Sequence, residues 1–232
     1  MIDVRVARVG RQNLRLATLA GLLIVMAIAS CVLADQRQTM AGEREPLTIE
    51  LVNQAGDVPG VWDAKIRARA VEALTRNAND VSRYWMGGKP VKVERGRPAG
   101  FRLIAVNRRL DYGGIPASGY HDHDQTGPYG IVNIGAAHGN VVMVYLLLSH
   151  ELAEAMVNPD DDRTLNGYAL EIVDPAVCCS YEIGLSDGSR VRLNTFVLPH
   201  WFTGGAGPYS YPPTKYIDAP LRTGPGGFKS PP

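Results

Sequence analysis

The sequence lacks most features of non-globular and nucleic-acid-binding proteins. It has only 3 cysteines in 232 residues, which excludes a small scaffold held together by several disulfides. Its formal net charge is +1, so it lacks the strongly basic composition that accompanies DNA or RNA binding. No heptad, glycine or solenoid repeat occurs, which excludes coiled coils, collagen-like chains and repeat arrays. We therefore expect a globular protein without a nucleic-acid partner.

Motifs of several enzyme classes are also absent. There is no G-x-S-x-G nucleophile elbow, no P-loop and no dinucleotide-binding fingerprint, so a serine hydrolase or a nucleotide enzyme has no support. What is present is apolar material, because 45% of the residues are hydrophobic. A chain of this length and composition can bury a substantial core within one domain.

Residues 1–34 predict export from the cytoplasm. A segment with four arginines precedes residues 16–34, which carry no charge, and this order is typical of signal peptides and membrane anchors. Residues 28–31, Ile-Ala-Ser-Cys, resemble a bacterial lipobox in which Cys31 is lipidated. Cleavage after Ala34 and an uncleaved anchor are the alternatives. We expect a protein of the cell envelope, on the outer face of a bacterial membrane and tethered by this segment, or a secreted one.

Hydrophobic periodicity predicts an α+β domain over residues 47–202, between a polar linker (35–46) and a Gly- and Pro-rich tail (203–232). We expect the helices to pack on the sheet, with helix 141–157 deeply buried because it begins VVMVYLLL. Residues 107–128 contain several glycines and predict a long loop. The predicted strands are 47–52, 91–93, 101–106, 129–134, 170–173, 181–185 and 191–193, and the predicted helices are 61–79 and 141–157.

A polar cluster interrupts the buried helix and suggests metal chemistry. His150 and Glu154 are four residues apart, so they share one helical face and can bind one ion, while Glu151 can reach a water on that ion. A catalytic zinc site has three protein ligands. Glu171 is the simplest third ligand, with Asp174 orienting an imidazole nitrogen or serving as an alternative ligand. The competing interpretation is that HExxE occurs by chance and its side chains are solvated.

Other histidines are weaker candidates. His121 and His123 alternate with Asp122 and Asp124, and they could hold a second ion or contribute to the first. Simple solvation of a polar loop is the favoured interpretation. His200 could donate a hydrogen bond to a developing oxyanion, although packing within an aromatic loop explains it better.

The adjacent cysteines Cys178 and Cys179 allow several interpretations. In an exported protein they could form a vicinal disulfide or pair with another chain. Their thiolates could also join the metal site. Buried or oxidised structural cysteines are the favoured interpretation.

The run SHELAEAMVNP followed by EIVDP resembles bacterial secreted and plant Exordium-type proteins, and more closely a set of bacterial and phage zincin-like proteins. The latter resemblance includes the stretches Gly-Tyr-His-Asp at 119–122, Tyr-Glu-Ile at 181–183 and Phe-Val-Leu-Pro-His-Trp-Phe at 196–202. It implies a zincin-like mixed sheet with an edge strand beside a buried metal-binding helix. Strand 129–134 would be that edge, where an extended peptide substrate could add as a further strand.

The resemblance also implies roles for individual residues. His150 and Glu154 are ligands, Glu171 is the third ligand and Glu151 is the general base. Well-characterised zinc peptidases generally carry HExxH, so Glu154 replaces a neutral imidazole with an anion. Such a site favours Mn²⁺ or Ca²⁺ more than a two-histidine site does, and it reduces the Lewis acidity of the ion. Zinc remains the first expectation.

Two functions follow from these observations. The first is an exported, membrane-tethered zinc metallopeptidase that acts on peptides or proteins. The second is a non-catalytic cell-envelope binding protein in which the metal stabilises the fold. The sequence does not indicate an oligomeric state.

Overall fold

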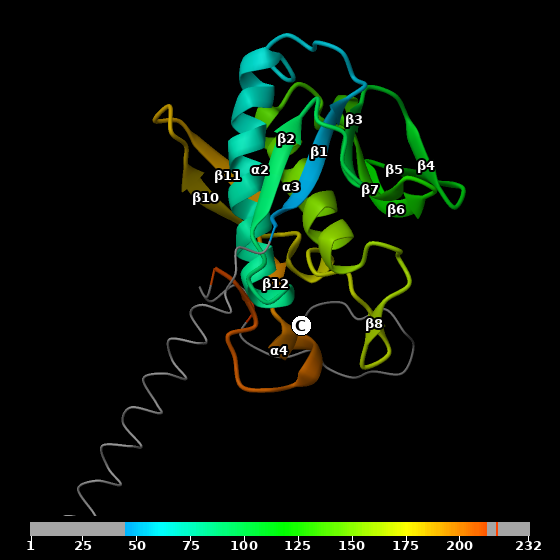
Figure 1. The fold of residues 1–232 in the computed structure, drawn as a ribbon, viewed down its shortest axis with the longest axis vertical. Helices are drawn as coiled ribbons and strands as arrows, with labels where there is room; N and C mark the ends of the chain where they lie inside the picture. Colours follow the sequence, from blue (N-terminus) through cyan, green and yellow to red (C-terminus); the bar gives the residue numbers. More distant parts are fainter. Residues whose placement is uncertain (1–44, 213–216, 218–232) are drawn as a thin grey trace, which may run out of the picture. The chain divides into compact units, whose positions relative to one another are not determined.

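Figure 1 shows the computed structural model of the protein, which describes residues 45–212 and residue 217. The predicted export segment with Cys31, most of the linker and most of the tail lie outside the described residues. None of the described helices combines the length and the apolar character needed to cross a membrane.

The described residues form a mixed α+β structure, as predicted. The strands are β1 (Leu47–Asn53), β2 (Val91–Arg95), β3 (Phe101–Val106), β4 (Leu110–Tyr112), β5 (Ile115–Ala117), β6 (Gly119–Asp124), β7 (Gly127–Asn133), β8 (Thr164–Leu165), β9 (Tyr168–Ala169), β10 (Ser180–Gly184), β11 (Arg190–Asn194), β12 (Phe196–Val197) and β13 (Ser210–Tyr211). The helices are α2 (Ala64–Trp85), α3 (Val141–Val157) and α4 (Pro199–Thr203), with 3-10 turns at Ile134–Ala137 and Asp174–Ala176.

The main sheet is mixed, with the strand order β2-β1-β3-β7-β6. The first four strands in this order are parallel, and β6 pairs antiparallel to β7. The prediction that strand 129–134 forms the sheet edge is therefore wrong, because this strand is β7 and lies between β3 and β6. The edge strand is β6, within residues that were predicted to be a loop.

Both long helices pack on one face of the main sheet (Figure 1). Alternation along the strands produces this core, because Ile49 and Leu51 of β1 point to the helices while the alternate residues Glu50 and Val52 are less buried. The β10–β11 hairpin packs against α3, so the helices lie between the sheet and the hairpin. The opposite face of the sheet carries a smaller cluster with Ile104 and Ile131, to which Leu110 of β4 contributes.

The helix is confirmed over residues 141–157, but the predicted deep burial of its start is wrong, because Val142 and Met143 are 38% and 40% exposed. Asn140 caps its start by accepting a hydrogen bond from Val142 N, and Asn158 ends it just before Pro159. Helix α2 differs from its prediction, because it continues past residue 79 to Trp85. The buried side chains of Val81 and Ser82 extend its packed face, so tertiary contacts prolong the helix.

Three segments that were predicted as loop, strand and tail have other structures. Residues 107–128 contain β4, β5 and β6 and the start of β7. Residues 170–173 do not form a strand but bend into the 3-10 turn Asp174–Ala176. Past residue 203, Ser210–Tyr211 pairs with β12, and Tyr211 stacks on Phe196 with ring centroids 5.0 Å apart.

Candidate metal centre

Helix α3 brings three polar side chains into a buried cluster. Its apolar first half holds it against the sheet, and His150, Glu151 and Glu154 follow in its second half. As their spacing predicts, His150 and Glu154 meet on one face, with His150 Nε2 2.9 Å from Glu154 Oε2. Only 6% of Glu151 and 3% of Glu154 is exposed, so the interpretation as solvated side chains is wrong for both.

The bend after residue 171 explains how Glu154 is held. The backbone N–H groups of Val173 and Asp174 donate hydrogen bonds of 3.0 and 3.2 Å to Glu154 Oε1. Glu154 Oε2 remains directed at His150. The bend also brings Asp174 Oδ1 to 3.3 Å from His150 Nε2, so Asp174 reaches the imidazole directly. A strand continuing through Asp174 could not direct both N–H groups at one oxygen, because consecutive N–H groups of a strand point in opposite directions.

Glu171 lies beside Glu154 but faces a different imidazole. Its Oε1 is 4.0 Å from Nε2 of His121, and it accepts a long hydrogen bond of 3.5 Å from Asn158 Nδ2. The side chain is 19% exposed. Glu171 thus lies in the same cluster as His150 and Glu154, but the imidazole that its carboxylate faces is that of His121.

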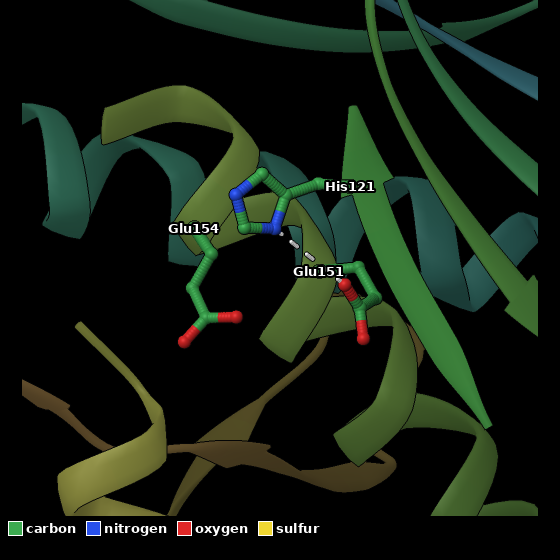
Figure 2. A group of neighbouring side chains, drawn as sticks. All are labelled: His121, Glu151 and Glu154. Carbon is green, nitrogen blue, oxygen red and sulfur yellow. Dashed lines mark ion pairs between the residues drawn. The ribbon is translucent and has the colours of Figure 1, made fainter. Parts of the chain in front are cut away.

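His121 is the site residue for which the sequence analysis favoured solvation over a contribution to an ion site. It projects from β6 toward the two glutamates of α3 (Figure 2), and only 6% of it is exposed. Its Nδ1 lies 3.9 Å from Glu151 Oε2, and its Nε2 lies 3.7 Å from Asp161 Oδ1. Nε2 is buried and has no hydrogen-bond partner among the described residues. The predicted solvation of this histidine is therefore wrong.

A signal for His121 was present in the sequence. The stretch 119–124 is followed by a turn and then by the apolar strand β7, which is the pattern of a hairpin. In a strand at that place His121 and His123 share one face. The structure separates them by depth, because the side chain of His123 is 55% exposed near the end of the hairpin, where its Nδ1 lies 3.5 Å from Asp122 Oδ1.

Two glycines allow α3 to approach the sheet at Glu151. A Cβ atom at Gly119 would lie 2.5 Å from Glu151 Oε1, and a Cβ at Gly130 would lie 3.2 Å from Glu151 Cβ. Side chains at these positions would therefore occupy the space of Glu151. The absence of side chains on neighbouring residues of β6 and β7 makes the pocket for this carboxylate.

The surrounding carboxylates control the protonation of both imidazoles. Burial disfavours charged His150, but Glu154 and Asp174 raise its pKa well above the ordinary value. Burial also disfavours charged His121. The hydrogen bond with Glu151 and the charges of the neighbouring carboxylates outweigh this effect of burial and raise the pKa of His121 to about 9. Both imidazoles therefore keep a bound proton to higher pH than an exposed histidine does.

The carboxylates respond to burial and to one another. Burial is the main cause that raises the pKa of Glu151. Burial, followed by the charge of Glu154, raises the pKa of Glu171 to about 8. The hydrogen bond with His150 lowers the pKa of Asp174. Within residues 45–212 and 217, only histidines form ion pairs with these carboxylates.

The donor atoms converge into three overlapping sets that fit a metal ion. In each set, the ligand atoms lie within 4.8 Å of one another. The sets are His150 with Glu154 and Asp174, His121 with Glu151 and Glu154, and His121 with Asp161 and Glu171. Ligands of a tetrahedral ion at about 2.0–2.1 Å are spaced by about 3.3 Å. The two distances from His150 Nε2, 2.9 and 3.3 Å, are close to that spacing.

The remaining candidates do not join these sets. His200 is exposed on α4, and no described polar contact connects it to the cluster, so its oxyanion role stays a prediction. Cys178 and Cys179 are free cysteines in the described chain, so the vicinal disulfide is not present, while pairing with another chain stays a prediction. Cys178 is exposed, so its interpretation as a buried cysteine is wrong. Their sulfur atoms are 2.7 Å apart, and burial raises the pKa of Cys179 to about 11.

Comparisons with protein-family models, with curated proteins and with solved structures found no match.

Proposed function

We propose that this chain is a metal-dependent hydrolase, exported and tethered by its N-terminal segment, that cleaves peptides with a zincin-like centre. One observation carries the proposal: Glu151 and Glu154 are almost fully buried beside two imidazoles, and no described Lys or Arg pairs with them. Among the described residues only the two imidazoles can offset the charge of these carboxylates, and burying carboxylates with incomplete compensation is costly. A shared divalent cation supplies the missing positive charge.

The first ion position is formed by His150, Glu154 and Asp174. This set modifies the predicted ligands, because Asp174 approaches His150 Nε2 to 3.3 Å while Glu171 faces His121. One imidazole and two carboxylates fit Zn²⁺, and they also suit Mn²⁺ or Ca²⁺. A divalent ion held there acts as a Lewis acid and lowers the pKa of water.

Glu151 is the general base of the proposed reaction. Burial raises its pKa, so it accepts a proton from water more readily than an exposed glutamate does. Water oxygen bonds to the peptide carbonyl carbon, the C–N bond breaks, and Glu151 returns the proton to the leaving amine nitrogen. The pocket beside Gly119 fixes the position of this carboxylate.

The choice of a peptide substrate rests on the resemblance of SHELAEAMVNP and EIVDP to zincin-like proteins. In this chain β6, and not β7, is the strand at the end of the main sheet. Because β6 also carries His121, a peptide paired with this edge would lie beside the cluster.

Hydrolysis of a peptide library by the full-length protein tests the proposal. Glu151→Gln keeps the shape of the side chain and removes the base, so we expect bound metal to be retained and turnover to fall about 10²–10⁴-fold. Glu182→Gln on the exposed face of β10 is the matched control and should leave turnover unchanged. Metal retention with no turnover in the unaltered protein would instead support the non-catalytic binding protein.

A further inference from the structure

Three potential ligands remain outside the ion position of the proposed hydrolase. His121 from β6, Asp161 from the loop after α3 and Glu171 from the bend all point to one place. His121 Nε2 is 3.7 Å from Asp161 Oδ1 and 4.0 Å from Glu171 Oε1. These distances are too long for hydrogen bonds, yet all three donor atoms lie within 4.8 Å of one another.

His121 is the independent indication that something binds here. Only 6% of its side chain is exposed, and Nε2 has no hydrogen-bond partner in the described part of the chain. Buried polar atoms nearly always have a partner, because leaving one unsatisfied costs free energy. A cation between the three donors gives Nε2 its partner and separates the two carboxylates.

Neighbouring residues orient the same donors. The Tyr112 hydroxyl donates to Asp161 Oδ2, which leaves Oδ1 facing His121. His121 Nδ1 faces Glu151 Oε2 at 3.9 Å, so its other nitrogen, Nε2, faces Asp161 and Glu171. An imidazole that binds a metal through one nitrogen commonly directs the other toward a carboxylate.

We propose a second divalent-cation site at His121 Nε2, Asp161 Oδ1 and Glu171 Oε1, beside the position formed by His150, Glu154 and Asp174. The proposal deepens the proposed function, because the two ions would share one cluster of carboxylates. Two carboxylates and one imidazole suit a metal such as Mn²⁺. Glu154 belongs to the first position and also forms a set with His121 and Glu151, so these residues connect the two positions.

Titration of the chelator-treated full-length protein with Mn²⁺, followed by calorimetry, tests the second site. We expect two ions per chain for the unaltered protein and one for His121→Ala or for His150→Ala. Asp161→Asn is a second variant of the new site and should also reduce the number of bound ions to one. The Asp161 side chain is 28% exposed, so this substitution should not disturb the fold. His123→Ala and Asp162→Asn are controls from the same strand and the same loop, and both should keep two ions.

The titration separates the second site from the hydrolase proposal. One ion per chain in the unaltered protein, abolished by His150→Ala, would overturn the second site while leaving turnover dependent on Glu151. Two ions that persist in both His121→Ala and Asp161→Asn would also overturn it. Two ions reduced to one by these variants, in a protein without peptide turnover, would support the second site and reject the hydrolase.

Discussion

At the scale of single residues, Gly119 determines where Glu151 can lie. The absent side chain of Gly119 leaves the space that the Glu151 carboxylate occupies, 2.5 Å from the position a Cβ would take. Because the obstructing atom is the end of a side chain, a methyl group there would move the carboxylate more than the backbone. The position of Glu151, the proposed general base, therefore depends on the absence of a side chain at Gly119.

Gly119→Ala should reduce peptide turnover by about 10-fold or more while bound metal is retained, because displacing a base by even 1 Å is costly. The measurements are steady-state kinetics and elemental analysis of the purified variant. Gly184→Ala is the matched control, since a Cβ there meets nothing within 4 Å. Equal turnover in both variants would show that the Glu151 carboxylate does not need its observed position.

Tyr112 offers a second test at this scale. Its hydroxyl donates to Asp161, and that hydrogen bond is the largest cause that raises the pKa of Tyr112 to about 12. Tyr112→Phe should weaken Mn²⁺ binding at the His121 position by about 10-fold or more, since removing partners that orient metal ligands typically costs 10–100-fold in affinity. Calorimetric titration measures this change. Unchanged affinity at both positions would mean that the hydroxyl does not orient Asp161.

At the scale of elements, two hydrogen bonds from Asn194 tie the β10–β11 hairpin to α3 just before the proposed metal ligands. Ser149 Oγ accepts from the backbone N–H of Asn194 at 2.9 Å, and both residues are buried. Ser149 also donates to Leu146 O. This connection fixes the start of the site-bearing half of α3 against β11.

Ser149→Ala should lower the free energy of unfolding by about 1–3 kcal/mol, because it leaves the buried N–H of Asn194 without a partner. Chemical denaturation of the metal-free protein measures the effect. Ser118→Ala, at an exposed position, should change the free energy of unfolding by less than about 0.5 kcal/mol. Equal stability of the two variants would contradict a structural role for the α3–β11 connection.

The elements also show which parts of the site a sequence can predict. His150, Glu151 and Glu154 were predictable because a single helix fixes their spacing and a long apolar run identifies that helix. The bend that presents Asp174 was not, since it depends on backbone N–H groups that donate to Glu154 across the fold. The burial of His121 was not predictable for a related reason, because it follows from the pairing of β6 with β7, where His121 lies opposite Gly130.

At the scale of the whole molecule, the cluster makes stability depend on pH. Glu171 has its pKa raised from an ordinary 4.5 to about 8, and His121 from 6.5 to about 9. Between the ordinary and the raised pKa of each group, from about pH 4.5 to about pH 9, the folded protein therefore binds more protons than the unfolded chain. By linkage, the folded state is then destabilised as pH rises.

The unfolding temperature of the protein in a chelator should consequently fall as pH rises from about 5 to about 9. Saturating Mn²⁺ should reverse or flatten this trend, because the ion replaces protons and binds best when the ligands are deprotonated. Scanning calorimetry at several pH values makes both measurements. A chelated protein whose unfolding temperature rises steadily over this range would contradict the described cluster.

The central claim is that the buried carboxylates and imidazoles exist to hold a cation. Elemental analysis of the full-length protein, purified without chelator, tests it most directly. We predict at least one equivalent of a divalent metal per chain, and its loss in a variant that combines His121→Ala with His150→Ala. A folded protein that contains no divalent metal, and takes up none from solution, would contradict the account.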